Sequence, residues 1–439
     1  MKTSILHPAI RLALSAAALS LAACATTAQV RPVPVATESH PTPVAEAPAA
    51  EAAAEAATSP ERTPDKPHPA QAVFTEAVAA FDAGDYDGAR AGFEKVLKLA
   101  PQSLNAQFNL GLIAERQGRV DDAVAAYEKV RFLEPGHVSM LLNLGRLYRQ
   151  QEKYPDAISL YETGLKTPGN EFEPALLNNL STAYRLAGKP AQAESSARRV
   201  LARHPDDAEA FKNLGLAALA QGRYRLAETV LLQARKLADK DPGVHNDLGM
   251  VYLKLEQRPR ALAQFQKAVA LDERFAPGHV NLGALALAWR DYAGAERAFA
   301  KAVELEPGSS SAWLSYAWAL DGQKGRDPQK GLAAGAAFEK VLALRAESSE
   351  AVCGAGWAYA VERAGWDKAE GFLQRCKASA STSAQDKQLI DSKLQGLAAL
   401  RKSAAAAPAA VGGSGALPDA APAESQGEAP AEPAPTPAE

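Results

Sequence analysis

The stretch that decides the fold is NAQFNLGLIAERQGRVDDAVAAYEKVRFLEP, at residues 105–135. It returns in altered form as HNDLGMVYLKLEQRPRALAQFQKAVALD at residues 245–272, and in further copies between and beyond these two. Each copy has a small residue at the same place, and successive copies are 34 or 36 residues apart: Gly111, Gly145, Ser181, Gly215, Gly249 and Gly283. A period of this length predicts an array of similar structural units.

Two further positions recur with the small residue. An alanine follows it by 12 residues in all six copies: Ala123, Ala157, Ala193, Ala227, Ala261 and Ala295. A large side chain follows that alanine by four residues in five copies, at Tyr127, Tyr161, Leu231, Phe265 and Phe299, whereas the third copy has Ala197. Small residues on two helices allow close approach, and a large residue one turn later fills the space beside the contact. The pattern therefore fits two closely packed helices in each copy, which cannot bury its apolar face alone and so stacks on its neighbours.

This pattern resembles the tetratricopeptide repeat family, whose paired helices form a superhelix. The resemblance implies an all-α superhelical solenoid of about nine helix pairs over residues 70–403. The first unit has Ala77 in place of the glycine, the eighth carries extra residues before Ala334, and the ninth is degenerate. Residues 384–402 predict a final helix that caps the open end of the array. In this family the fold is used mostly as a binding scaffold, so the repeat indicates fold more sharply than function.

The sequence LSLAACA at residues 19–25 predicts where the protein is located. Lys2 and Arg11 give the chain a positive start, and the apolar run that follows is too short to span a bilayer. Residues 1–23 therefore predict a secretory signal peptide. The sequence before Cys24 resembles a bacterial lipobox, which implies lipidation at Cys24, and Ala25 rather than Asp implies outer-membrane sorting with the protein facing the periplasm. The alternative is an ordinary signal peptide that contains a cysteine.

Both ends of the chain differ in composition from the repeats. Residues 24–69 are rich in Pro, Ala, Thr and Glu, and residues 404–439 are rich in Ala, Pro and Gly with acidic side chains and neither Lys nor Arg after Lys402. Such segments bury too little apolar surface to fold alone. We expect a disordered tether behind the lipidated cysteine and a disordered acidic tail, with a short docking segment in the tail as the alternative.

The first helix of each pair is expected to form the concave face of the superhelix. Two residues before the small residue the sequence has an amide in most copies, at Asn109, Asn143, Asn179, Asn213 and Asn281, with Asp247 interrupting the series. Nearby on the same helices lie Arg146, Arg149, Asn178, Arg185 and Lys212. Guanidinium and amide groups together suit a carboxylate or an acidic segment of a partner protein. The alternative is that the amides belong to the repeat pattern and the charges are solvated surface.

Later repeats replace these polar residues with apolar ones, at Leu219, Met250, Leu253, Val280 and Leu287. We expect that part of the groove to suit an apolar segment or a partner helix.

The remaining chemistry-bearing residues indicate neither catalysis nor metal binding. Cys353 and Cys376 lie in the ninth unit and are expected either to form a disulfide in an oxidising compartment or to remain two buried thiols. Seven histidines are scattered, and no nucleophile, phosphate-binding or metalloprotease motif accompanies them. The net charge of −3 does not favour nucleic-acid binding. We expect no enzyme activity, no cofactor and no metal.

The sequence favours a lipid-anchored scaffold for an envelope-spanning machine. The architecture resembles repeat lipoproteins of the type IV pilus (pilotins) and of myxobacterial gliding motility. The length of the array and its two flanking segments favour the second of these. The alternatives are a pilotin-like assembly factor and a periplasmic adaptor that presents substrates to proteases or cell-wall hydrolases. The sequence leaves the partner and the oligomeric state open.

Overall fold

The computed structural model describes residues 69–406, which form nineteen α-helices and one short 3-10 helix and contain no strand. The helices of the first five pairs are α2 (Pro69–Asp82), α3 (Tyr86–Leu99), α4 (Leu104–Arg116), α5 (Val120–Leu133), α6 (Val138–Gln150), α7 (Tyr154–Gly164), α8 (Pro174–Leu186), α9 (Pro190–Leu201), α10 (Ala208–Ala220) and α11 (Tyr224–Leu237). The later helices are α12 (Pro242–Lys254), α13 (Arg258–Leu271), α14 (Ala276–Ala288), α15 (Tyr292–Leu305), α16 (Ser310–Asp321), α17 (Pro328–Leu344), α18 (Ser349–Tyr359), α19 (Trp366–Ala378) and α20 (Ala384–Ala406), with η3 at Arg363–Gly365.

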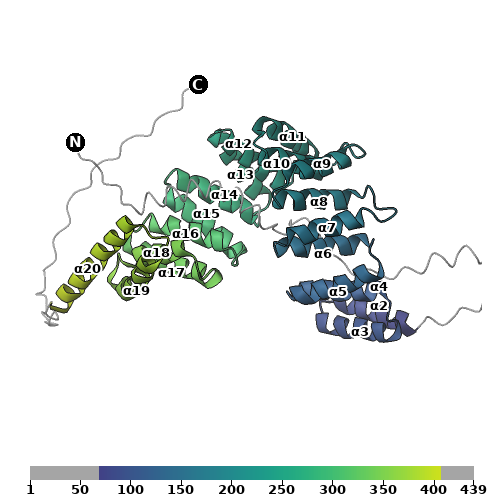
Figure 1. Cartoon of the computed structure of the whole chain (residues 1–439), viewed down its shortest axis with the longest axis horizontal. Coiled ribbons are helices and arrows are strands. Elements are labelled where there is room, and N and C mark those ends of the chain that lie inside the picture. Colours follow the sequence, from purple (N-terminus) through teal and green to yellow (C-terminus); the bar gives the residue numbers. More distant parts are fainter. Residues whose placement is uncertain (1–68, 407–439) are drawn as a thin grey trace, which may run out of the picture.

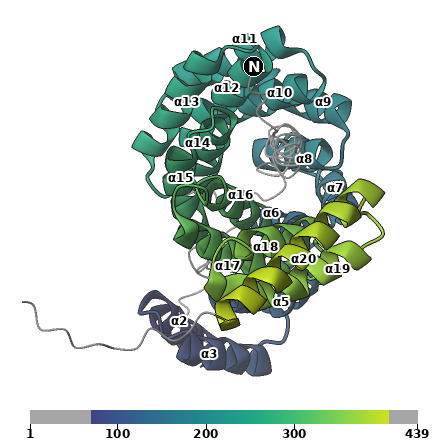
Figure 2. The same ribbon diagram turned by 90° about the vertical axis from the view of Figure 1, so that its left-hand side faces the viewer.

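The helices form nine consecutive pairs, α2/α3 to α18/α19, followed by α20. Each helix packs mainly on the one before it and the one after it, so the chain winds as a solenoid (Figure 1). In Figure 2 the helices curve round a common axis, with α10, α12, α14 and α16 on the inner side and α11, α13 and α15 on the outer side. The predicted all-α repeat solenoid is confirmed.

The recurring small residue determines how closely the helices of a pair approach. A Cβ placed on Gly111 would lie 2.5 Å from Cε1 of Tyr127, and one on Gly249 would lie 2.5 Å from Cε1 of Phe265. The rings themselves are fully buried. The first helix of these pairs therefore has no room for even a methyl group where the ring of the second helix rests.

The fourth pair, α8/α9, solves the same packing problem with different residues. It has Ser181 where the others have glycine and Ala197 where the others have a large side chain. The Ser181 hydroxyl, which is buried, donates to the backbone oxygen of Ala193 at 2.7 Å. A larger residue on one helix thus accompanies a smaller residue on the other, and the buried hydroxyl has a partner.

The turn between the two helices of a pair uses a left-handed backbone conformation. Glycine occupies this position in Gly84, Gly118, Gly188 and Gly222, with φ from 70° to 80°. Glu152, Glu256 and Arg290 occupy it in three other pairs, with φ near 60°. The turn geometry is therefore kept even where the side chain disfavours it.

The C-terminal end of the array is reinforced covalently. Cys353 of α18 and Cys376 of α19 form a disulfide, with their Cα atoms 4.9 Å apart. The last helix, α20, lies beyond this pair, and its Ile390 and Leu397 are buried in the same apolar cluster as Cys376. The disulfide and α20 together stabilise the last pair, which has no further repeat to pack on.

The helical part begins at Pro69 and ends at Ala406, where residues 70–403 were expected. None of the helices between these residues is long and apolar enough to span a bilayer. The predicted signal peptide (1–23), the lipidation site Cys24, and nearly all of the expected tether and tail lie outside the described residues.

The contact between Gly111 and the ring of Tyr127 predicts that adding one methyl group at this glycine lowers the stability of the fold. Replacing Gly111 by Ala forces the added Cβ against Tyr127, so we expect a loss of about 1–3 kcal/mol of stability. Gly371→Ala is the matched control, because this exposed glycine within α19 has no neighbour within 4 Å of its Cβ position. The control should stabilise the chain by about 0.5–1 kcal/mol. Denaturant titration followed by circular dichroism measures both; equal effects would contradict the packing argument.

The disulfide predicts that both thiols resist alkylation until the protein is reduced. A covalent link across 23 residues is worth about 3 kcal/mol on the chain-entropy model. We therefore expect reductant to lower the unfolding midpoint of the wild-type chain and to leave a Cys353→Ser/Cys376→Ser double variant unchanged. Alkylation of both cysteines without reductant, read by mass spectrometry, would show that they are free thiols.

Candidate protein-binding groove

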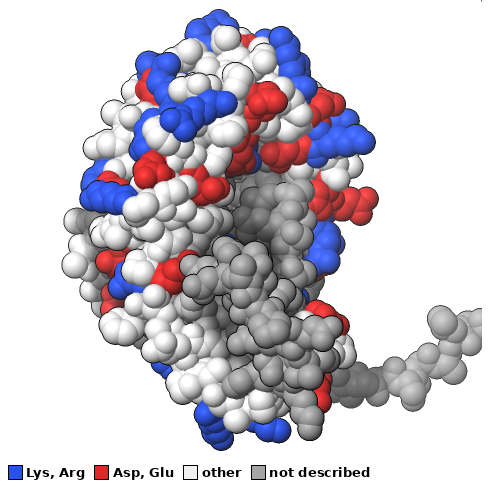
Figure 3. Space-filling model, turned by 90° about the vertical axis from the view of Figure 1, so that its right-hand side faces the viewer, with Lys and Arg blue, Asp and Glu red and all other residues white. Residues whose placement is uncertain are grey.

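The candidate site is the inner side of the superhelix, formed by the first helix of each pair. We call α4, α6, α8, α10, α12 and α14 the inner wall. The space-filling view shows a hollow in the molecule with Asp and Glu side chains near its edge (Figure 3). The row predicted from sequence, Asn109, Asn143, Asn179, Asn213, Asp247 and Asn281, places one member on each of these six helices.

Two amides of this row bond to the preceding repeat. Asn281 Nδ2 donates to Asn246 Oδ1 at 2.7 Å, from α14 to α12. Asn213 Nδ2 donates to the backbone oxygen of Asn178 at 3.2 Å, from α10 to α8. Both Asn213 and Asn281 are almost fully buried, and Asn109 is completely buried. These amides hold neighbouring repeats in register, which is a structural use that the sequence pattern did not distinguish from ligand binding.

Asn178 also forms a hydrogen bond to the next repeat. Its Nδ2 donates to Oδ1 of Asp207 at 3.3 Å, and Asp207 in turn caps α10 by accepting from the backbone of Ala210 at 2.7 Å. The Asn178 side chain therefore connects α8 to the beginning of the next inner helix.

Arg146 likewise has an internal partner. It forms an ion pair with Glu115 of the preceding repeat, and both side chains are largely buried. Tyr127 donates its hydroxyl to the same carboxylate at 2.6 Å. Burial and the adjacent Glu115 raise the pKa of Tyr127, so its hydroxyl stays protonated. Asn143 lies beside this group, as a hydrogen-bond partner of Tyr127. Arg146 is thus committed to the contact between the second and third pairs.

Arg149 and Arg185 differ from the other candidates because each has a buried nitrogen atom without a hydrogen-bond partner among the described residues. We call them the basic pair. Arg149 is 6% exposed and donates through one terminal nitrogen to Asn179 Oδ1 at 2.8 Å. The Nε atoms of both arginines are buried without a hydrogen-bond partner among the described residues. Burial lowers the pKa of Arg185, which the carboxylate of Asp247 opposes and the neighbouring Arg149 reinforces.

Two more polar atoms that are buried without a hydrogen-bond partner among the described residues lie shortly after Arg149 in the sequence. They are Oε1 of Gln151, at the end of α6, and the hydroxyl of Tyr154, at the beginning of α7. Tyr154 is within electrostatic range of Arg185. Buried polar groups are nearly always paired, so these atoms distinguish this part of the inner wall from the rest of it. Sequence analysis missed Gln151 and Tyr154, which stand outside the inner-helix pattern.

Lys212 faces carboxylates on both sides. Its Nζ lies 2.5 Å from Glu209 Oε2 and 3.3 Å from Asp241 Oδ2. Burial works to lower the pKa of Lys212, but the two carboxylates raise it above its ordinary value. The ammonium is therefore charged and neutralised within its own repeat and the next.

Asp247 of α12 stands where the other inner helices have an amide, and the pKa of its carboxyl is strongly raised. Burial raises the pKa of Asp247 to about 7, although Lys212 and Arg185 work to lower it. Asp241 and Glu209 add to the increase. Asp247 forms no ion pair within 4.0 Å among residues 69–406, so the neighbouring charges affect its pKa through longer-range electrostatic interactions. This group changes charge near neutral pH.

The later part of the inner wall is apolar, as the sequence predicts. Leu219 and Met250 are buried between the helices. Leu253, Val280 and Leu287 remain partly exposed, so their side chains can contact a further molecule.

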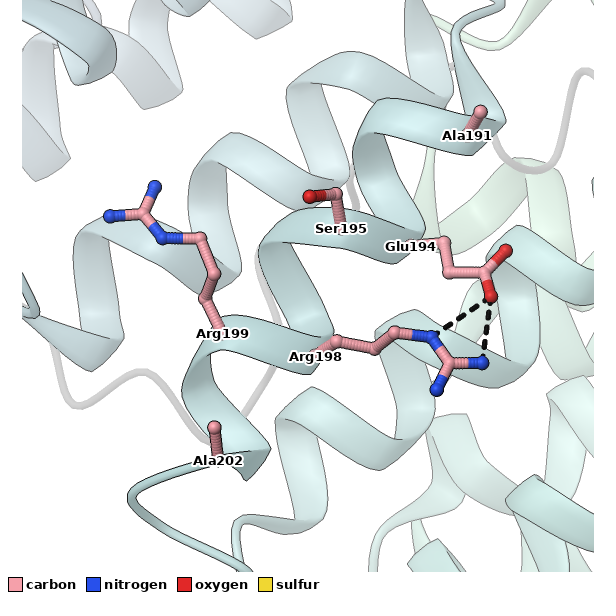
Figure 4. Close-up of a pocket in the computed structure, with 6 residues that line it drawn as sticks. All are labelled: Ala191, Glu194, Ser195, Arg198, Arg199 and Ala202. Atoms are coloured by element: carbon pink, nitrogen blue, oxygen red, sulfur yellow. Dashed lines mark hydrogen bonds and ion pairs between the residues drawn. The ribbon is translucent and has the colours of Figure 1, made fainter.

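A shallow, open depression lies on α9 and the residue that follows it (Figure 4). It has a volume of about 450 Å³ and is lined by Ala191, Glu194, Ser195, Arg198, Arg199 and Ala202. Arg198 contacts Oε1 of Glu194 at 3.0 Å and 2.8 Å, and Gln221 of the next repeat donates to Oε2 at 3.0 Å. Burial would raise the pKa of Glu194, but its hydrogen bonds from Gln221, Arg198 and Arg223 lower it to about 2. This depression is the outer surface of a contact between repeats.

The described residues contain no cluster of side chains suited to a metal ion. No group of three or more His, Cys, Asp or Glu side chains in residues 69–406 could hold a metal ion. The buried His245 contacts Gln264 Oε1 and the backbone oxygen of Asp239, each at 2.8 Å, which is a structural role.

The raised pKa of Asp247 predicts a pH-dependent stability. A carboxyl whose pKa rises from 3.8 unfolded to about 7 folded is harder to ionise in the fold, so stability is lost as pH rises from about 4 to about 7. Replacing Asp247 by Asn removes this penalty. We expect the variant to gain about 2 kcal/mol more, relative to wild type, at pH 8 than at pH 5. Urea titrations at both pH values test this, with the exposed Asp206→Asn as control; equal pH dependence of variant and wild type would contradict it.

Comparisons with known proteins agree with the fold. Residues 74–132, 108–171 and 178–242 match the tetratricopeptide repeat family model, and residues 230–329 match the model of the middle TPR-like domain of cilia and flagella-associated protein 70. A tetratricopeptide repeat protein from Parabacteroides merdae is 19% identical, with a TM-score of 0.53, over 57% of this chain and 98% of that chain. No curated protein matches the chain.

Two other solved structures share the fold more loosely. PilW, described as a widely conserved type IV pilus biogenesis factor, is 18% identical over 46% of this chain and 92% of that chain, with a TM-score of 0.40. YrrB, described as a TPR protein with an unusual peptide-binding site, is 19% identical over 42% of this chain and 95% of that chain, with a TM-score of 0.33. These likenesses concern the fold alone. The family model thus recognises tetratricopeptide repeats within residues 74–242, and residues 69–406 as a whole form a solenoid of the tetratricopeptide repeat type.

Proposed function

We propose that this chain is a lipid-anchored scaffold of the bacterial outer membrane that faces the periplasm. It holds other envelope proteins together through its inner wall during assembly of an envelope-spanning machine. A gliding-motility complex is the first machine to test, because the overall architecture resembles repeat lipoproteins of that kind. The scaffold contributes binding and no chemistry of its own.

The observation that carries the proposal is the long inner wall with its unused polar groups. Tetratricopeptide repeats typically bind peptides or proteins and are not catalytic. Here six successive inner helices, α4 to α14, supply a continuous surface that changes from polar to apolar. The basic pair, Arg149 and Arg185, retains buried nitrogen atoms without partners, as expected of a surface that a further protein completes.

Two features support the proposed compartment. The residues that precede Cys24 resemble a lipobox, and an apolar run of this length with a positive start is typical of exported proteins. A disulfide between Cys353 and Cys376 suits an oxidising compartment such as the periplasm. A lipidated N-terminal cysteine with several acyl chains gives stable membrane attachment.

The anchoring step predicts the outcome of one substitution. Cys24→Ser removes the thiol that accepts the lipid, so we expect the protein to move from the outer-membrane fraction to the soluble or inner-membrane fraction. Cys353→Ser is the matched control, since it alters a cysteine of the last repeat pair and leaves Cys24 in place. Membrane fractionation with immunoblotting measures the result. An unchanged outer-membrane fraction of Cys24→Ser would contradict lipid anchoring.

Crosslinking in living cells, followed by affinity capture and mass spectrometry, tests the scaffold itself. We expect a fixed set of outer-membrane and periplasmic proteins. A changing set of hydrolases or proteases with their substrates would instead identify an adaptor. Recovery of pilus secretin components would identify a pilotin-like assembly factor.

A further inference from the structure

One edge of the solenoid carries the most exposed large apolar side chain among residues 69–406. Phe132, at the end of α5, is 87% exposed, whereas no other such side chain in this range exceeds 49%. Leu133 beside it is 39% exposed, and Phe172 of the next pair is 43% exposed. Single exposed apolar residues are ordinary on protein surfaces, but a group of them marks a contact surface.

The connection between α7 and α8, which carries Phe172, is built into the same edge. It lies in a repeat step of 36 residues, where the other regular repeats step by 34. Asn170 Nδ2 donates to the backbone oxygen of Gly136, in the turn after α5, at 2.7 Å. From the other side, Arg199 of α9 donates to the backbone oxygen of Glu171 at 3.0 Å. The connection therefore links the ends of α5, α7 and α9 and presents its aromatic ring there.

Three cationic side chains lie beside this ring. Arg203 stacks on Phe172, with its guanidinium carbon 3.3 Å from the ring centroid, and the guanidinium carbon of Arg199 lies 5.9 Å from the same centroid. Lys166 is exposed in the connection itself. Arg199 points to the side of α9 opposite Arg198 (Figure 4). Within residues 69–406 none of the three cations forms an ion pair, so their charges face solvent.

Other charges on this edge are mostly held internally. Arg131 is neutralised by Glu128 at 2.8 Å, and the exposed Glu171 accepts from the backbone N–H of Gly169 at 3.0 Å. Glu134 is exposed in the turn after α5. Helix C-termini favour basic side chains by themselves, but that preference does not account for the exposed rings among them. We call the following residues the edge patch: Phe132, Leu133, Lys166, Phe172, Arg199 and Arg203.

A phospholipid surface matches this combination of groups. Apolar side chains enter the boundary between headgroups and acyl chains, and Lys and Arg are attracted to acidic lipids. The proposed lipid on Cys24 keeps such a surface within reach, because only residues 25–68 lie between Cys24 and α2. A chain of this length spans at most about 150 Å. The second, third and fourth pairs, which form the edge patch, belong to the half of the array nearer that anchor along the chain.

We propose that the edge patch binds the surface of an acidic phospholipid bilayer. Its three apolar side chains enter the headgroup boundary, and its three cations contact lipid phosphates. Because the patch lies at the ends of the second helices, the inner wall stays open to other proteins while the solenoid rests on the membrane. The inference rests on the proposed function for the nearness of the bilayer, and it concerns a surface other than the groove.

The test uses the chain from residue 24 to residue 439 with Cys24→Ser, so that neither a signal peptide nor a lipid contributes. Co-sedimentation with sucrose-loaded vesicles measures the partition coefficient. One vesicle type contains phosphatidylcholine alone, and the other contains about 30% phosphatidylglycerol. Circular dichroism checks that each variant is folded, and sedimentation velocity without vesicles measures self-association.

We expect the partition coefficient to be about tenfold or more higher for the acidic vesicles at low salt, and to fall as salt screens the charges. Phe132→Ser/Phe172→Ser should weaken binding to both vesicle types by about tenfold or more, because two rings no longer leave water. Arg199→Gln/Arg203→Gln should remove most of the preference for acidic lipid and leave binding to the neutral vesicles nearly unchanged.

Arg225→Gln and Leu226→Ser are the matched controls. Both residues are exposed at the beginning of α11, so they lie at the opposite ends of the second helices, and both variants should bind as the wild type does. Undiminished binding of Phe132→Ser/Phe172→Ser, or equal binding of the wild type to the two vesicle types, would overturn the proposal. A chain that binds no vesicles but forms a dimer abolished by Phe132→Ser would also overturn it, and would assign the patch to a second copy. Fractionation of Cys24→Ser tests the anchor separately, so failure of the edge patch leaves the proposed function standing.

Discussion

The contact between a glycine of one helix and a ring of the next is the constraint on which the rest of the structure depends. It brings the two helices of a pair together at Gly111 and Tyr127, and again in later pairs, with no space for an added methyl group. Because each pair has nearly the same geometry, stacking the pairs gives a regular superhelix. The inner wall exists because this geometry repeats: side chains at one sequence position come to lie in one row.

The regularity also explains how the structure tolerates exceptions. In the fourth pair, Ser181 stands where other pairs have glycine, and Ala197 stands where they have a large side chain. The added hydroxyl of Ser181 donates a hydrogen bond to the backbone oxygen of Ala193. Glu152, Glu256 and Arg290 take the left-handed turn that glycine adopts elsewhere. In each case the stacking of neighbouring pairs outweighs a local preference worth about 1 kcal/mol. The last pair has a neighbour on one side only and is held instead by the disulfide and α20.

The fold could be predicted from sequence because its main determinants are local and periodic. The spacing of about 34 residues, the small residue and the alanine 12 residues later predict the six regular pairs. The irregular pairs at the two ends follow by continuation of the period, and the final helix follows from the need to cap the array. The side-chain partners could not be predicted in the same way. Arg149 bonds to Asn179, 30 residues away, and Asn213 bonds to Asn178, 35 residues away. Such contacts depend on the angle between neighbouring repeats, which the repeat pattern does not encode. For the same reason the sequence could not tell that Arg146 is paired with Glu115 while Arg185 retains a buried Nε without a partner.

The row of amides contributes to the contacts between neighbouring repeats along the inner wall. Amides such as Asn213 and Asn281 are neutral and can both donate and accept, so they can be buried between repeats at little electrostatic cost. A carboxylate at the same position cannot be satisfied by the backbone oxygens and amide oxygens of a neighbouring repeat. Asp247 is therefore poorly suited to holding repeats together, and burial raises its pKa to about 7. Asp247 is the one member of the row that is not an amide, and its carboxylate also acts to raise the pKa of Arg185. Packing alone would favour asparagine at this position, because a neutral amide carries no cost of ionisation when buried, whereas the carboxyl of Asp247 does.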